Sequence, residues 1–326
     1  MASVAMVEAV TMALAWELEH DDSVVVLGED VGINGGVFRA TAGLAARFGD
    51  QRVIDTPLAE TMIAGLSVGM AAQGMKPVAE AQFMGFIYPM VDQIICHAAR
   101  MRHRTRGRMS CPMVLRAPFG GGIHAPEHHS ESTEAIFAHM PGVRVVIPSS
   151  PSRAYGLLLA AIRDPDPVVF LEPKRIYRLN KEEVEDNGED LPLDVCYVLR
   201  DGTDITLVTW GAMVKETLEA AQKLEENGIS AEVIDVATIS PLDMDTIIES
   251  VSKTGRCVIV HEAARMCGVG AEIAAGLADA GIYHLHAPVK RVTGYDSIMP
   301  LYKMEMKYMP SVQRILNAVN EVMEVS

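Results

Sequence analysis

The sequence has few cysteines, few basic residues and no long apolar run, and each shortage excludes a class of protein. Its five cysteines are scattered without a CxxC pair, so we expect neither a zinc site nor a disulfide framework, and a cytoplasmic location fits best. Lys and Arg number 28 against 43 Asp and Glu, and the resulting net charge of −15 argues against nucleic acid or an anionic membrane as a partner. No apolar run approaches the ~18 residues of a membrane span.

Apolar residues are plentiful, at 49%, and they recur as short runs separated by helical patterns. Runs such as residues 23–27 (SVVVL) predict buried parallel strands, whereas residues 60–73 and 88–104 predict helices. The same alternation resumes near residue 205, so we expect an α/β fold with two parallel-sheet domains. The expected domains are residues 1–179 and 201–326, with a charged linker at residues 180–200.

Two segments follow the first two predicted strands, where ligands of open α/β sheets bind. Residues 28–36 (GEDVGINGG) are rich in glycine, which permits close ligand approach but serves a structural turn equally well. Residues 55–60 (DTPLAE) end in Glu60, which begins a helix of small apolar residues. A carboxylate buried there needs a partner or a raised pKa. The alternative is a favourable acidic residue in the first turn of a helix.

A third segment, residues 119–130 (FGGGIHAPEHHS), combines a glycine run with three histidines. Acid–base chemistry or anion binding by histidine is favoured over a metal site, because the adjacent His128 and His129 do not easily ligate one ion. The basic run at residues 97–108 (HAARMRHRTRGR) lacks interleaved aromatic residues, so we interpret it as a solvated or intersubunit helix face rather than a nucleic-acid site.

Several segments in this order resemble one family over essentially the whole chain: GEDVG, RVIDTPLAE, PVAEAQFMGF, PMVDQI, HHSES, PGVRVVIPSSP, DPDPVVFLEPKRIYR, RVTGYD and PLYKMEMKYMPS. The chain resembles the beta subunit of the first, decarboxylating component of 2-oxo acid dehydrogenase complexes. The resemblance implies a pyrimidine-binding domain followed by a transketolase C-terminal-like domain. It also implies an α2β2 heterotetramer, with thiamine diphosphate held between an alpha and a beta subunit.

The resemblance assigns roles to individual residues of this chain. Glu60 matches the glutamate that hydrogen-bonds the aminopyrimidine ring and favours its imino tautomer, whose nitrogen takes the proton from the thiazolium carbon. His129 matches the active-site histidine that handles intermediates and assists acyl transfer to lipoamide. The remaining matches line the pyrimidine side of the pocket: Glu29, Leu58, Gln82 and Phe86.

A structural potassium ion is a further implication of the resemblance. Its ligands in the family are largely backbone carbonyls with an acidic side chain. The matching positions here are Met113, Ala161, Ile162, Asp164 and Asp166. Asp166 replaces the asparagine of some members, which puts occupancy of the site in question.

The sequence contains no GDG motif, which thiamine-diphosphate enzymes use to hold the magnesium–diphosphate group. Because that group needs hard oxygen ligands, we expect the alpha subunit to hold the magnesium. The acidic C-terminal domain is the expected docking face for the basic subunit-binding domain of the lipoyl acyltransferase.

Pyruvate is the favoured substrate, because the GGGIHAPEHHSES loop resembles bacterial pyruvate-type sequences, with branched-chain acids such as 2-oxoisovalerate as the alternative. Two alternatives of other classes are a non-catalytic assembly subunit and a metal hydrolase built on the histidine loop. The presence of both Glu60 and His129 argues against the assembly subunit.

Overall fold

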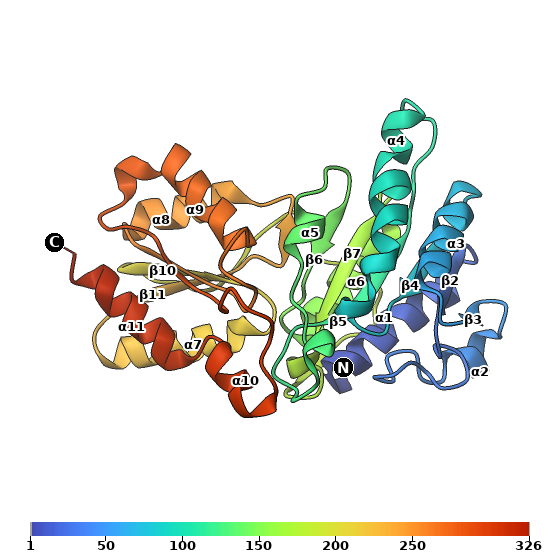
Figure 1. Cartoon of the computed structure of the whole chain (residues 1–326), viewed down its shortest axis with the longest axis horizontal. Coiled ribbons are helices and arrows are strands. Elements are labelled where there is room, and N and C mark those ends of the chain that lie inside the picture. Colours follow the sequence, from blue (N-terminus) through green and yellow to red (C-terminus); the bar gives the residue numbers. More distant parts are fainter. Residues whose placement is uncertain (1, 326) are drawn as a thin grey trace. The chain divides into compact units, whose positions relative to one another are not determined.

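The computed structural model describes residues 2–325, which divide into two compact units (Figure 1). Within these residues, the first unit comprises 2–119 and 136–193, and the second comprises 120–135 and 194–325. Each unit contains a predominantly parallel sheet with helices, so the expected α/β class is confirmed. The glycine- and histidine-rich loop thus belongs to the second unit, although the chain before and after it belongs to the first.

The sheet of the first unit is parallel throughout, with strand order β6-β7-β5-β4-β2-β3. Its strands coincide with the apolar runs of the sequence, and every residue of β2, β5 and β7 is buried, as a sheet covered on both faces requires. Their bounds are β2 Val24–Gly28, β3 Val53–Asp55, β4 Lys76–Glu80, β5 Val114–Phe119, β6 Arg144–Val146 and β7 Val168–Pro173.

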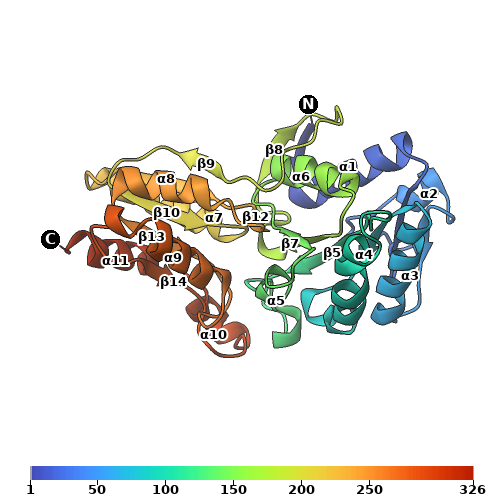
Figure 2. The same cartoon turned by 90° about the horizontal axis from the view of Figure 1, so that it is seen from above.

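Helices cover both faces of this sheet. The two helices α1 (Met6–His20) and α6 (Pro151–Arg163) pack against each other, and α3 (Glu60–Ala72) packs against β4. Figure 2 shows α1 and α6 on one side of the strands, with α3 and the short α4 (Met101–Arg104) on the other. Two further short helices are α2 (Leu44–Phe48) and α5 (Ala135–Ala138).

Two expectations for the first half differ from the structure. The prediction of one regular helix over residues 88–104 was wrong, because 3₁₀ turns and a π-helix at Gln93–His97 precede α4. Apolar periodicity signals a helical path but does not distinguish these hydrogen-bond patterns. The expected linker at residues 180–200 contains strand β8 (Lys181–Val184), which pairs antiparallel with β1 (Ala2–Ala5), and strand β9 (Tyr197–Arg200). The domain boundaries stay a prediction.

The sheet of the second unit has the order β14-β13-β10-β11-β9, with only the edge strand β9 antiparallel. Figure 1 shows α8 and α9 on one face of this sheet and α7 and α11 on the other. Besides β9, the strands of this sheet are β10 Ile205–Thr209, β11 Ala231–Asp235, β13 Cys257–Val260 and β14 Lys290–Val292, while the short strand β12 (Thr238–Ser240) lies outside it. The helices are α7 Met213–Glu226, α8 Met244–Thr254, α9 Val269–Ala280, α10 Tyr302–Tyr308 and α11 Val312–Met323.

None of the helices in the described part of the chain combines the length and the apolar character that crossing a membrane requires.

Candidate functional site

The loops at the carboxyl ends of β2 and β3 are joined by one aspartate. Asp55 ends β3, and its two carboxylate oxygens accept hydrogen bonds from the backbone N–H groups of Gly32, at 2.6 Å, and Ile33, at 3.1 Å. A Cβ at Gly32 would lie 2.9 Å from this carboxylate, so the close approach requires glycine. Parallel pairing of β2 with β3 and β4 brings the three strand ends to one edge of the sheet.

The residues predicted for the pyrimidine side lie in the loops at this edge. Glu60 is the first residue of α3 and is half-buried, directly after the exposed Leu58. Glu29 follows β2, and its pKa is raised by burial and by the neighbouring carboxylates of Asp30 and Glu60. Gln82 follows β4, and the half-buried Phe86 lies in the next turn. The structure therefore places Glu29 near enough to Glu60 for their charges to interact.

A fully buried ion-pair cluster lies in the sheet at β4, β5 and β7. The Arg116 guanidinium donates to Glu80 at 2.8 Å and to both oxygens of Glu172 at 2.6 and 2.9 Å, and the Tyr177 hydroxyl also donates to Glu172. Burial alone would lower the pKa of Arg116, but the carboxylates of Glu172 and Glu80 more than reverse this and raise it. The cluster holds β4 in register immediately before the loop that carries Gln82.

The chemistry of this edge fits an aminopyrimidine ring. The Thr56 hydroxyl oxygen is buried and has no hydrogen-bond partner within residues 2–325, so it can serve a bound molecule. At the same edge lie the carboxylate of Glu60 and the apolar side chains of Leu58 and Phe86, which are the kinds of group that such a ring needs. Leu58, Met62 and Leu66 are 70%, 41% and 42% exposed and recur every four residues, which leaves an apolar stripe along the start of α3.

The acidic residues of the predicted potassium site are engaged with arginines. Arg102 donates to both oxygens of Asp166 at 2.8 and 3.0 Å, and Arg144 pairs with Asp164 at 3.2 Å. Asp164 also accepts the backbone N–H of Asp166 at 2.8 Å. These contacts bring Asp164 and Asp166 together, but a cation there would have to share both carboxylates with guanidinium groups. The donor set therefore fits potassium poorly.

His129 lies in the second unit, in a 3₁₀ turn at Glu127–His129. The loop that carries it contacts two buried glutamates that the sequence analysis did not single out, Glu262 and Glu305. Glu262 follows β13 and was detectable as a polar residue at the carboxyl end of a predicted strand, whereas the sequence around Glu305 (YKMEMKY) gives no such signal. Glu60 and His129 thus belong to different units.

Further titratable groups are buried near this loop. Burial raises the pKa of Glu134 to about 8, and the Glu262 carboxylate adds to this effect. His261 stacks on Trp210 with ring centroids 5.0 Å apart, and burial together with the charge of Arg291 lowers its pKa to about 3. Both side chains are therefore neutral at pH 7. No group of three or more His, Cys, Asp or Glu residues within residues 2–325 is arranged to hold a metal ion.

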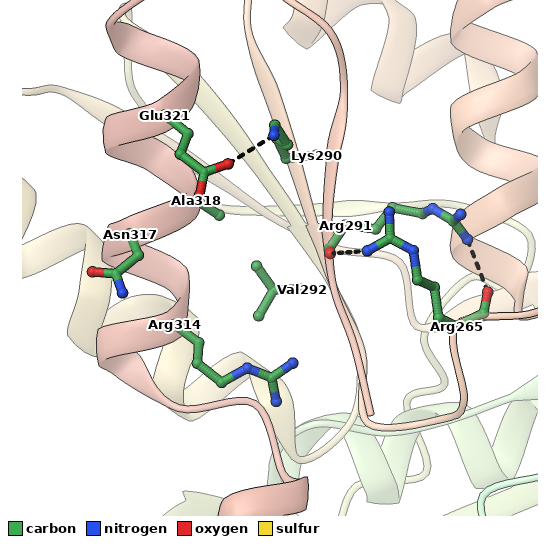
Figure 3. Close-up of a pocket in the computed structure, with 8 residues that line it drawn as sticks. All are labelled: Arg265, Lys290, Arg291, Val292, Arg314, Asn317, Ala318 and Glu321. Atoms are coloured by element: carbon green, nitrogen blue, oxygen red, sulfur yellow. Dashed lines mark hydrogen bonds and ion pairs between the residues drawn. The ribbon is translucent and has the colours of Figure 1, made fainter. Parts of the chain in front are cut away.

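A separate cavity of about 280 Å³ lies beside α11 and has a cationic lining (Figure 3). Lys290 pairs with Glu321 at 2.7 Å, while Arg265 and Arg291 each reach the other's backbone carbonyl, as Figure 3 shows. Arg314 donates to three backbone carbonyls, including that of Thr293 at 2.6 Å. The Lys290–Glu321 pair and the bond from Arg314 to Thr293 fasten α11 to β14 and the residue that follows it.

Comparison with known proteins gives a consistent result. The family described as "Transketolase, pyrimidine binding domain" matches residues 2–180, and "Transketolase, C-terminal domain" matches residues 195–315. A solved structure titled "Split gene transketolase, inactive beta4 tetramer" has a TM-score of 0.82 at 24% identity, covering 99% of each chain, which shows a shared fold.

Two curated relatives carry the name pyruvate dehydrogenase E1 component subunit beta. The chain is 49% identical to the Bacillus subtilis protein over 324 residues, covering 99% of this chain and all of that one. It is 50% identical to the Acholeplasma laidlawii protein over 315 residues, covering 97% of this chain and 96% of the relative. The chain therefore belongs to the family of pyruvate dehydrogenase E1 component beta subunits.

Proposed function

We propose that this chain is the beta subunit of a thiamine-diphosphate-dependent dehydrogenase that decarboxylates pyruvate and transfers the acetyl group to the lipoyl domain of an acyltransferase. The observation that carries the proposal is Glu60, a half-buried carboxylate that begins α3 at the carboxyl edge of the first sheet. The full-length identity to subunits named for pyruvate supports pyruvate over branched-chain 2-oxo acids.

Four of the predicted site residues, Leu58, Glu60, Phe86 and His129, have a task in this reaction. Bound thiamine diphosphate supplies the electron sink for loss of carbon dioxide. The Glu60 carboxylate holds a proton at the pyrimidine ring nitrogen, while Leu58 and Phe86 pack against the ring, and Gln82 and Glu29 lie in the adjoining loops. His129 donates or accepts a proton at the reacting substrate oxygen and assists acyl transfer.

A partner subunit completes the site. The exposed apolar side chains of Leu58, Met62 and Leu66 lie next to Glu60, where an alpha subunit would cover them in an α2β2 heterotetramer. The sequence has no GDG motif, so we assign magnesium and the diphosphate to that subunit. We assign docking of the acyltransferase to the C-terminal domain, and we place the reaction in the cytoplasm because all five cysteines are free thiols.

Potassium belongs to the proposal only through the carbonyls of Met113, Ala161 and Ile162, because arginines occupy the two carboxylates. If the ion binds, potassium chloride should raise the melting temperature above that in sodium chloride at the same ionic strength. Equal melting temperatures in the two salts would remove potassium from the proposal.

Reconstitution tests the main proposal. We expect the isolated chain to bind thiamine diphosphate weakly in calorimetry and to gain pyruvate turnover when co-expressed with an alpha subunit. Glu60→Gln should reduce turnover to background, because the amide cannot hold a proton as the carboxylate does, while gel filtration still shows the tetramer. Tight cofactor binding by the chain alone, or turnover in Glu60→Gln, would refute the shared site or the role of Glu60. Faster turnover of 2-oxoisovalerate than of pyruvate would reassign the substrate.

A further inference from the structure

Two buried glutamates of the second unit converge on the glycine-rich loop that carries His129. Glu262 Oε1 accepts the backbone N–H of Gly121 at 3.0 Å and the Ser132 hydroxyl at 2.6 Å. Glu305 Oε1 accepts the N–H of Gly122 at 2.7 Å, and its Oε2 accepts the N–H of His124 at 2.9 Å. Glu262 therefore binds both ends of the loop, at Gly121 and Ser132, and Glu305 binds its first half, at Gly122 and His124.

The glycines of the loop are explained by these carboxylates. Gly120 has φ +87°, and a Cβ there would lie 2.3 Å from Glu262 Oε1. Gly122 has φ +85°, which also places it in the left-handed region. The glycine run thus lets the backbone turn its N–H groups toward Glu262 and Glu305, whose burial makes those hydrogen bonds costly to lose.

The turn that contains His129 lies between two anchors, which are the contacts of His124 with Glu305 and of Ser132 with Glu262. On one side, the His124 ring nitrogen Nδ1 lies 3.1 Å from Glu305 in addition to the backbone contact. On the other side, Ser132 binds Glu262, and the Gly120 N–H donates to the Glu131 carbonyl at 2.8 Å, which closes the loop. Between these points the His129 N–H donates to the Pro126 carbonyl at 3.0 Å. The anchors restrict where this turn can lie.

We propose that Glu262 and Glu305 are positioning residues that fix the place of His129 through the backbone of residues 120–132. The proposal rests on the function proposed above for His129. Neither glutamate needs to contact substrate, because a displacement of about 1 Å in a reacting group can reduce a rate roughly 100-fold. Glu305 lies in α10, and Glu262 is the second residue after β13. Both belong to the second unit, so the position of the loop depends on the fold of that unit.

We call the hydrogen bonds from the loop to Glu262 and Glu305 the clamp. Amide hydrogen exchange tests the clamp independently of enzyme activity. In the co-expressed tetramer, Glu305→Gln and Glu262→Gln should each increase exchange of the amides at residues 121–124 by about tenfold or more. Glu305→Gln replaces one of two accepting oxygens with an NH2 group, whereas Glu262→Gln removes the charge that strengthens both bonds to its single accepting oxygen. Ser132→Ala removes the hydrogen bond from Ser132 to Glu262 but keeps both carboxylates. It therefore replaces a glutamine variant in this test if that variant fails to fold. Glu232→Gln is the matched control, because Glu232 is also buried and accepts a loop N–H, from Gly202, outside this loop. Unchanged exchange at residues 121–124 in all three test variants would overturn the clamp.

A double-mutant cycle tests the link to His129. Glu305→Gln should lower kcat by roughly 100-fold with little change in KM for pyruvate, and it should add no further loss in a His129→Ala background. Additive losses would overturn the positioning role, because they mean that Glu305 acts independently of His129. Full turnover in His129→Ala would instead refute the proposed role of His129, while the exchange measurement still decides whether the clamp exists.

Discussion

Each unit holds a glycine-rich loop with carboxylates, but the two units expose those carboxylates to water very differently. In the first unit, the exposed Asp55 accepts the N–H groups of Gly32 and Ile33. In the second, Glu262 and Glu305 are 3% and 1% exposed. Water can replace the loop as a partner of Asp55, whereas a buried carboxylate that loses its donors remains desolvated. The first loop can therefore open at small cost, and the second cannot.

The two units also compensate buried acidic residues in different ways. In the first, Arg116 pairs with Glu80 and Glu172, so the charges neutralise one another. In the second, burial raises the pKa of Glu134 to about 8, so the side chain stays protonated at neutral pH. The first arrangement is a fixed structural ion pair, whereas the second responds to pH within the ordinary working range of an enzyme.

The largest expected effect comes from removing the cation of the first unit. Arg116→Met leaves Glu80 and Glu172 buried without a positive partner, and we expect the free energy of unfolding to fall by about 3–5 kcal/mol. Arg102→Met is the matched control, because its pair with Asp166 is partly exposed and should contribute less than about 1 kcal/mol. Denaturant unfolding of both variants measures the difference. Similar losses would show that burial of the pair carries no special cost.

The second effect is a pH dependence specific to the second unit. The pKa of Glu134 is about 8 in the folded chain and near 4.5 when unfolded, so its contribution to stability is complete below pH 4.5 and is lost as the pH rises through 8. Glu134→Gln should therefore lose less stability than the wild type between pH 4.5 and 8, by several kcal/mol. Melting curves across that range measure the difference, and parallel pH profiles would contradict a protonated Glu134.

His261 changes stability in the opposite direction. Burial, together with the Arg291 charge, holds its folded pKa at about 3, below the ordinary 6.5, so its contribution is present above pH 6.5 and is lost as the pH falls toward 3. The Glu134→Gln variant should still lose the stability contributed by His261 as the pH falls toward 3. The acid limb of the melting profile is therefore an internal reference for the Glu134 comparison.

The sequence predicted the strands well, because strands depend on local patterns, and the same patterns located the loops that carry the first candidate site. The run SVVVL lies largely within β2, and the segment DTPLAE begins α3 at Glu60. Parallel strands carry their following loops to one edge, so placing Glu29, Glu60 and Gln82 at that edge required only the strand bounds. The roles of these residues remain predictions.

The clamp of the second unit was not predictable in the same way. Gly121 and Glu262 are 141 residues apart, and Gly122 and Glu305 are 183 apart, so no local pattern relates them. The grouping of residues 120–135 with the second unit depends on such long-range contacts. Glycine and histidine identified the loop as a candidate site, but the contacts of Glu262 and Glu305 with it were visible only in the fold.

The smallest expected effect is on the exposed clamp of the first unit. Asp55→Asn replaces one carboxylate oxygen with an NH2 group, which cannot accept the N–H of Gly32 or Ile33, so one hydrogen bond is lost. We expect a loss of about 1 kcal/mol and faster amide exchange confined to the loop at residues 28–36, because water replaces the missing acceptor. Asp50→Asn, which removes the same charge from another exposed site, should change neither measurement. A loss as large as that in Glu262→Gln would mean that exposure does not set the strength of these clamps, and the contrast between the two loops would fail.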